Sequence, residues 1–196
     1  MNGIEAVLRQ AAHHLDAGKA RWALIGGLAI SVWTEPRFTR DVDIAVAVAN
    51  DDDAESLTRR FLAVGYEVVA SVEQEVVGRL ATVRLRPMDA GDGDPVLDLL
   101  FASSGIEHEI VADADIVEVV PGLELPVARA GHLVALKLLS EADSRPQDAA
   151  DLAAIRQHLS SEELERARGA VRLIAERGYN RGRDLVEDLA SWARGR

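Results

Sequence analysis

Two aspartates, Asp41 and Asp43, stand at the start of a valine-rich apolar segment, and they constrain the fold more than any other feature. The alternation of apolar with small or acidic residues up to Val48 predicts a strand, in which residues two apart point to the same face. The two carboxylates are then neighbours, and their mutual repulsion raises the cost of ionising both. A hard divalent cation with oxygen ligands would remove that cost. The alternative without a metal is that Arg37 and Arg40 neutralise the two aspartates in salt bridges at the surface.

A third aspartate lies inside another apolar segment, residues 96–101. Asp98 is costly in such a strand unless it is paired or bound to a metal. If this strand lies beside the first one, three carboxylates converge. A cluster of this kind can hold two magnesium ions about 3.5–4 Å apart for an in-line displacement at phosphorus. The open alternative is an ion pair between Asp98 and Arg84 or Arg86, which lie on the preceding predicted strand.

A glycine pair, Gly26 and Gly27, separates a predicted strand at residues 22–25 from a predicted helix at residues 28–33. Glycines allow phosphates to approach the backbone amides at a helix N-terminus. The pair alone is a weak signal. It gains weight because the two aspartates begin fourteen residues after Gly27 and a third aspartate follows on a later strand.

The order of predicted elements indicates an α/β (α+β) fold, with a small mixed sheet flanked by helices and followed by a helical C-terminal region. We expect a boundary near residue 128, with an α/β domain at residues 1–128 and a helical region at residues 129–196 packed on it. Further strands are predicted at residues 42–48, 66–71, 79–86, 96–101, 116–120 and 124–127. Helices are predicted at residues 4–16, 51–64, 130–141, 146–158, 161–177 and 182–194.

Composition limits the partners. The chain of 196 residues has no cysteine, which excludes disulfides and thiolate metal sites. No apolar stretch reaches the length of a membrane span and no signal peptide is recognisable, so we expect a cytoplasmic protein without a membrane partner. The net charge of −11 disfavours nucleic-acid binding by the surface as a whole. From Arg166 onward, however, eight arginines stand against four acids, so contact with a polyanion would be local to this tail.

Lysine is rare in this chain. Of 22 basic residues only Lys19 and Lys137 are lysines, and Lys137 lies in an apolar predicted helix. Its rarity and its apolar neighbours favour a functional role over a side chain that buries only its stem, although that second interpretation stays open.

The series Gly26-Gly27, Arg37-x-Thr39-x-Asp41-x-Asp43 and Asp98 resembles the polymerase-β-like nucleotidyltransferase superfamily. It is most similar to the AbiEii branch, which includes toxin components of bacterial toxin–antitoxin pairs. That branch also has a later helical lysine followed by Arg-x-Lys-Asp-x-x-Asp. The corresponding residues here are Lys137 and then Arg145, Gln147, Asp148 and Asp151. The resemblance covers residues 22 to about 152.

This resemblance implies an enzyme that transfers a nucleoside monophosphate from an NTP to a hydroxyl acceptor and releases pyrophosphate. Asp41 and Asp43 would bind both magnesium ions, for which Mn²⁺ can substitute. Asp98 would share one ion and act as base on the acceptor hydroxyl. We expect tRNA or another RNA as the first acceptor to consider, and an antitoxin protein as a partner.

The resemblance also assigns the phosphate contacts. Lys137, with help from Arg40, would contact the nucleotide phosphates, and Asp148 would support Lys137. In the alternative, purely structural interpretation, Asp148 only stabilises the start of its helix. Gln147 stands where the motif often has lysine, and the chain is shorter than typical toxins of the branch.

Two other functions stay open. One is a non-catalytic module that keeps the fold and a surface for a nucleotide or partner, which the Gln147 departure supports. The other is a metal-dependent phosphohydrolase that uses the same carboxylates on water. The sequence leaves undetermined which NTP is used, whether the acceptor is RNA, protein or a small alcohol, and the oligomeric state.

Overall fold

The computed structural model describes residues 3–37, 39–74, 77–91, 93–140 and 146–195. Phe38, inside the first motif, Arg145, inside the second, and Glu141, the predicted end of a helix, lie outside the described residues. The strands are β1 (Arg21–Ile25), β2 (Asp41–Ala47), β3 (Tyr66–Gln74), β4 (Arg79–Pro87), β5 (Val96–Leu100), β6 (Asp115–Val120) and β7 (Leu123–Val127). The helices are α1 (Gly3–Ala17), α2 (Gly26–Trp33), α3 (Asp51–Ala63), α4 (Glu107–Ala112), α5 (Ala130–Ser140), α6 (Pro146–His158), α7 (Ser161–Glu176) and α8 (Leu185–Arg194).

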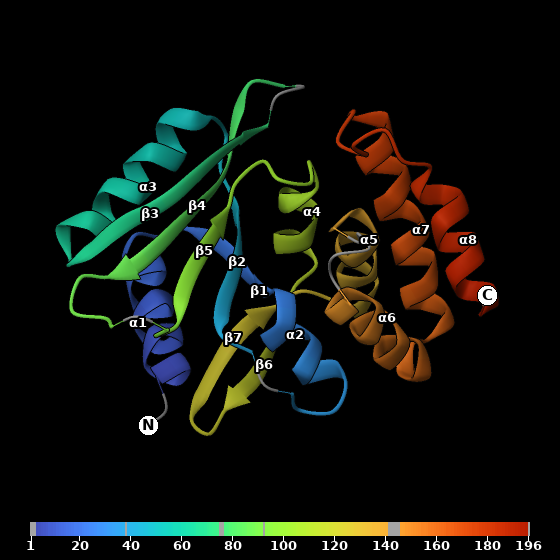
Figure 1. Ribbon diagram of the computed structural model, residues 1–196, viewed down its shortest axis with the longest axis horizontal. Coiled ribbons are helices and arrows are strands. Elements are labelled where there is room, and N and C mark those ends of the chain that lie inside the picture. Colours follow the sequence, from blue (N-terminus) through green and yellow to red (C-terminus); the bar gives the residue numbers. More distant parts are fainter. Residues whose placement is uncertain (1–2, 38, 75–76, 92, 141–145, 196) are drawn as a thin grey trace.

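The strands form one mixed sheet of seven, in the order β3-β4-β5-β2-β1-β7-β6 (Figure 1). β2 runs antiparallel to β1 and parallel to β5, and β5 runs antiparallel to β4. In Figure 1, α1 and α3 lie on one side of the sheet, and α4 and the C-terminal helices lie on the other. The predicted fold class, a small mixed sheet flanked by helices with a helical C-terminal region, is therefore confirmed.

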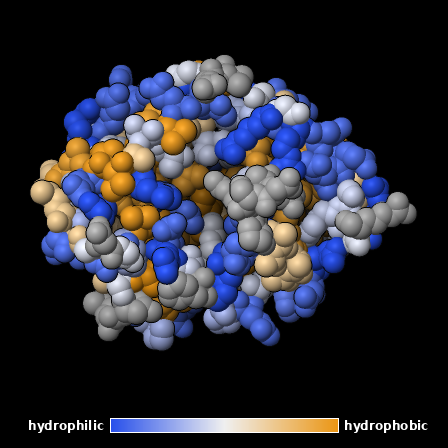
Figure 2. All heavy atoms as spheres, viewed as in Figure 1, coloured by the Kyte–Doolittle hydropathy of each residue, from blue (hydrophilic) through white to orange (hydrophobic). Residues whose placement is uncertain are grey.

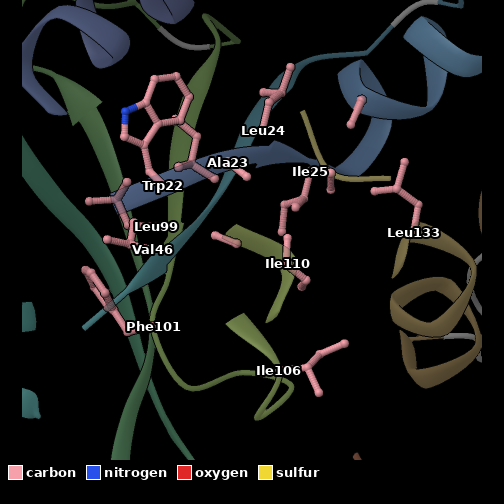
Figure 3. Close-up of a cluster of buried hydrophobic side chains, with 14 of the residues drawn as sticks. Trp22, Ala23, Leu24, Ile25, Val46, Leu99, Phe101, Ile106, Ile110 and Leu133 are labelled. Carbon is pink, nitrogen blue, oxygen red and sulfur yellow. The ribbon is translucent and has the colours of Figure 1, made fainter. Parts of the chain in front are cut away.

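The central strands are held by apolar side chains on the face opposite the aspartates. Ile44 on β2 and Leu97 and Leu99 on β5 are fully buried. Figure 3 shows Leu99 in a cluster with residues of β1, β2 and α4, including Trp22 and Ile110. Each such aliphatic side chain contributes about 1.5–3 kcal/mol on burial. Polar residues at these positions are therefore costly, and Asp98, buried between Leu97 and Leu99, is the exception on β5.

Helix α2 lies between the sheet and the C-terminal helices and contacts both. α5 packs against α6, α7 and α8, and α2 contacts both α5 and α6. β7 ends at Val127 and α5 begins at Ala130, which is where the predicted boundary falls. The division into two domains stays a prediction. Within the described ranges, no helix is both long and apolar enough to cross a membrane.

Several elements differ from the prediction: α2 begins at Gly26 rather than at residue 28, β3 extends to Gln74, and α4 and α8 differ more. α4 was not predicted, because Ala102-Ser-Ser-Gly before it suggests a loop. The buried Glu107 carboxylate folds back to accept hydrogen bonds from the backbone amides of Ser103 and Ser104, at 2.9 and 2.7 Å, and so fixes the start of that helix. α8 begins at Leu185 rather than at residue 182, because Asp184 caps it by accepting from the Glu187 amide at 3.1 Å.

Candidate active site

The three aspartates meet on neighbouring strands. In the parallel β2–β5 pair, Asp43 lies opposite Asp98 and Asp41 lies opposite Val96. Asp41 and Asp43 share a face of β2 because they are two residues apart. All three carboxylates line one cleft of about 1030 Å³. The space-filling view shows the surface hollowed between the sheet and the C-terminal helices (Figure 2).

The glycine pair makes room for side chains of the site itself. Gly26 lines the cleft with φ of +65°, and a Cβ built on it would lie 1.9 Å from Oδ2 of Asp43. Gly27 is buried, and its Cβ would lie 2.7 Å from Nη2 of Arg37 and 2.9 Å from Oγ1 of Thr39. Access of phosphates to the backbone is the reason for glycine that the sequence predicts here. The structure adds close packing against Asp43 and Arg37.

Substituting Gly26 with alanine should therefore destabilise the protein by about 2–3 kcal/mol, from the strained positive φ plus the collision with Asp43. Gly122→Ala is the matched control, because Gly122 has φ of +73° but nothing within 4 Å of its Cβ position. Chemical denaturation of both variants measures the difference. Equal losses would show that backbone strain alone matters and that Asp43 yields to a methyl group.

The cluster is electrostatically strained. The pKa of Asp43 is raised from 3.8 to about 7, first by burial and then by the neighbouring charges of Asp98 and Asp41. Lys137 and Arg84 act in the opposite direction, without cancelling the effect. A bound cation would relieve this repulsion.

Arg84 contacts these carboxylates directly. It stands opposite Asp98 in the antiparallel β4–β5 pair. Its Nε donates to Oδ1 of Asp98 at 2.8 Å, and its Nη2 donates to Oδ2 at 2.6 Å. The alternative pairing of Asp98 with an arginine of the preceding strand is thus present. It involves Arg84, whereas Arg86 binds Glu67.

The donor set fits magnesium, although it is not preassembled. In the part of the chain that the structure describes, no three histidine or acidic side chains are already grouped as metal ligands. Asp41, Asp43 and Asp98 nevertheless supply carboxylate oxygens to one cleft, which are the ligands that Mg²⁺ prefers. The pKa of Asp43 is raised because its negative charge is buried beside two others, and such an ion would remove this electrostatic repulsion.

Lys137 projects from α5 into the same cleft and is held by α6. Its Nζ lies 2.6 Å from Oδ1 of Asp148 and 2.9 Å from Oδ2 of Asp151. Ser140 Oγ donates to Asp148 at 3.1 Å. The side chain of Lys137 therefore does not snorkel to solvent, and Asp148 does more than stabilise its helix. It fixes the ammonium at the cleft wall.

Three residues outside the predicted site, Arg37, Gln147 and Asp151, complete this network. Asp151, whose side chain is only 1% exposed, accepts a hydrogen bond from Nη2 of Arg37 at 2.8 Å. Gln147 donates to the same carboxylate at 3.2 Å. Asp148 and Asp151 are three residues apart in the sequence, which places both on one face of α6 and could have indicated a role for Asp151. The link from Asp151 to Arg37 spans 114 residues and had no local signal. Arg40 is exposed and does not line the cleft.

The arginine-rich tail is largely neutralised within the molecule. Each of five arginines in it pairs with a nearby acid: Arg166 with Asp113, Arg168 with Glu165, Arg177 with Glu109, Arg183 with Asp188, and Arg194 with Glu187. These pairs leave the tail less cationic than its sequence indicates.

A mixed sheet that presents two aspartates on one strand and a third on the parallel neighbour, beside a strand–glycine–helix turn, resembles the nucleotidyltransferase architecture that the sequence motifs predict. A family model described as "Nucleotidyl transferase AbiEii toxin, Type IV TA system" matches residues 12–195. The chain belongs to this family of nucleotidyltransferases.

Solved structures share the fold at low sequence identity. An antigenic nucleotidyltransferase-like protein from Paracoccidioides brasiliensis is 17% identical with a TM-score of 0.52, and the match covers 96% of this chain and 91% of that one. The antibiotic-resistance factor ANT(2'')-Ia is 16% identical with a TM-score of 0.51, over 100% of this chain and 94% of that one. No curated protein matches the sequence significantly.

Proposed function

We propose that this protein transfers a nucleoside monophosphate from a magnesium-bound NTP to a hydroxyl group of an acceptor. The observation that carries this proposal is the register of β2 and β5, which brings Asp43 opposite Asp98 on the floor of a cleft that Lys137 also lines. Membership of a nucleotidyltransferase family supports the same reaction class.

Each residue of the cleft has a proposed role that follows from its position. Asp41 and Asp43, with Asp98, would hold magnesium, for which Mn²⁺ can substitute. When bound, the metal supplies charge stabilisation for the reacting phosphoryl group and the departing pyrophosphate. Lys137 directs its ammonium at the phosphates, and Asp148 keeps it in place. Gly26, which lines the cleft, would open the start of α2 to the triphosphate, whereas Gly27 is buried against Arg37.

The reaction exchanges one bond to phosphorus for another. The acceptor oxygen forms a bond to the α-phosphorus, and the bond from that phosphorus to the oxygen bridging to the β-phosphate breaks. Pyrophosphate leaves with the electron pair. Asp98 accepts the proton of the acceptor hydroxyl. Lys137 neutralises charge on the departing phosphates. Arg40 is exposed, so a contribution from it requires that the nucleotide extend beyond the cleft.

For the acceptor we propose RNA, with tRNA first, and we propose an antitoxin protein as the partner that controls the activity. The family supports the second point, since its model describes the toxin of a toxin–antitoxin system. The ion pairs of the tail limit the surface on which RNA could bind. Arg181, which lines the cleft from the loop after α7, is the tail arginine best placed to meet it.

The test is incubation of the protein with magnesium, each α-labelled NTP and total tRNA, beside the variant Asp43→Asn. Label on RNA with the wild type only would support the transferase and name nucleotide and acceptor together. If RNA stays unlabelled, the same assay with cell protein and with small-molecule alcohols separates the remaining acceptor classes. Absence of label on all three, with no magnesium-dependent NTP binding, would contradict the proposal.

A non-catalytic nucleotide-binding module is the second candidate, favoured by Gln147 in place of the motif lysine. Gln147 keeps a hydrogen bond to Asp151, so the group around Lys137 is assembled without the extra charge. Magnesium-dependent NTP binding without turnover on any acceptor would support this candidate. Release of phosphate without a labelled acceptor would instead indicate hydrolysis.

A further inference from the structure

The Arg84 guanidinium engages both oxygens of the carboxylate that the proposed reaction needs as a base. Its Nε and Nη2 form a two-pronged contact with Asp98 at 2.8 and 2.6 Å. The same Nη2 lies 3.7 Å from Oδ2 of Asp41. Arginine is suited to this geometry because its planar fork matches a carboxylate and its charge is permanent.

One nitrogen of Arg84 thus lies close to oxygens of both Asp98 and Asp41, two of the residues that would hold a metal ion. A monovalent guanidinium and a divalent cation at the same oxygens repel each other strongly in a cleft that is only partly solvated. Occupation by the two cations is therefore competitive. Lys137 is different, because it is tied to Asp148 and Asp151 on the opposite wall.

We propose that Arg84 is an internal counter-cation that holds Asp98 in the resting protein and is displaced when a metal-bound nucleotide enters the cleft. This inference rests on the proposed function. The Arg84 side chain is 43% exposed and lines the cleft, so it has open space to move into. The nucleotide phosphates then give it new anionic partners.

The consequence is a coupling between metal and nucleotide. Metal alone must displace Arg84 without compensation, whereas metal with nucleotide brings the phosphates that receive the guanidinium. Metal binding should therefore be weak in the nucleotide-free protein and strong when the nucleotide is bound, so that the carboxylates seldom bind metal without nucleotide.

The experiment measures Mn²⁺ binding to the nucleotide-free protein by the electron paramagnetic resonance signal of free Mn²⁺. A guanidinium close to a carboxylate lowers its affinity for a proton by about ten- to a thousandfold, so removing the guanidinium should raise metal affinity at least about tenfold. We expect Arg84→Gln to bind Mn²⁺ at least that much more tightly than the wild type. Arg84→Lys, which keeps a charge but loses the fork, should lie between them.

Arg86→Gln is the matched control. Arg86 lies two residues along β4 and makes a similar contact to Glu67, with Nη2 at 2.6 Å, and it is not among the residues that line the cleft. It should leave Mn²⁺ affinity unchanged. Circular dichroism of each variant establishes that it is folded, and Arg84→Lys supplies the comparison if Arg84→Gln does not fold.

The outcomes separate this inference from the function on which it rests. If Asp43→Asn abolishes Mn²⁺ binding but Arg84→Gln binds no more tightly than the wild type, the counter-cation role is wrong and the metal site stands. If Arg84→Gln binds less tightly, Arg84 instead positions Asp98 for the metal, which also overturns the inference. If Asp43→Asn binds as the wild type does, the proposed metal site itself is wrong.

Discussion

Replacing Asp43 with asparagine is expected to lower nucleotidyl transfer about a thousandfold or more, because it removes the carboxylate at the centre of the proposed metal site. The change is nearly isosteric, and Asp43 lies on a strand whose neighbours Val42 and Ile44 are fully buried. The fold should therefore persist. The measurement is the rate of label transfer at saturating magnesium and NTP.

The same variant should be more stable than the wild type in the absence of metal. The pKa of Asp43 is raised from 3.8 to about 7, so the unfolded chain loses the proton at lower pH than the folded protein does. The free energy of unfolding therefore falls as the pH rises between these values and stays low above about 7. Asparagine avoids that loss, which we estimate at about 2–4 kcal/mol.

At pH 8 with a chelator, Asp43→Asn should melt about 5–10 °C above the wild type, and at pH 4 the difference should vanish. Magnesium together with NTP should raise the melting temperature of the wild type at pH 8 more than that of the variant. Asp52→Asn, at an exposed acid of α3, controls for the change in net charge. A variant that is less stable at both pH values would mean that the Asp43 carboxylate is satisfied in the metal-free protein.

Much of this site could be predicted because its signals are local. Two aspartates at a period of two in a valine-rich strand must share a face, and an aspartate such as Asp98 between buried leucines needs a partner. Lys137 was found by its rarity and its apolar surroundings. These arguments need only the chemistry of a residue and of its immediate neighbours.

The choice between Arg84 and Arg86 was beyond the sequence for a different reason. Both arginines lie on β4 with the same spacing and chemistry, and only the register of β4 against β5 decides which one stands opposite Asp98. Register depends on the packing of the entire sheet. A shift by two residues would leave every side chain on its own face and would bring Arg86 opposite Asp98 instead.

The contact between Arg37 and Asp151 could not be predicted from the sequence, for a third reason. It joins the segment before β2 to α6, and nothing in either segment specifies the other. α4 was missed because a buried acid, Glu107, starts it from a sequence typical of a loop. Long-range polar contacts and helix starts made by buried side chains both depend on the finished tertiary structure.

Replacing Lys137 with methionine is expected to destabilise the protein by about 3–5 kcal/mol, because it leaves buried carboxylates without their cation. Asp148 would retain the hydroxyl of Ser140 as its measured contact, whereas Asp151 would keep Arg37 and Gln147. The loss should therefore come mainly from Asp148. Thermal and urea denaturation measure it, and a decrease of about 10 °C in melting temperature corresponds to the estimate.

A second substitution separates the two roles of Lys137. In Lys137→Met/Asp148→Asn the uncompensated charge is gone, so most of the lost stability should return. Transfer should stay about a hundredfold or more below the wild type, because no ammonium faces the phosphates. If activity returns together with stability, Lys137 only supports the fold. If stability returns and activity does not, the Lys137 ammonium is needed for transfer itself and not only for the stability of the fold.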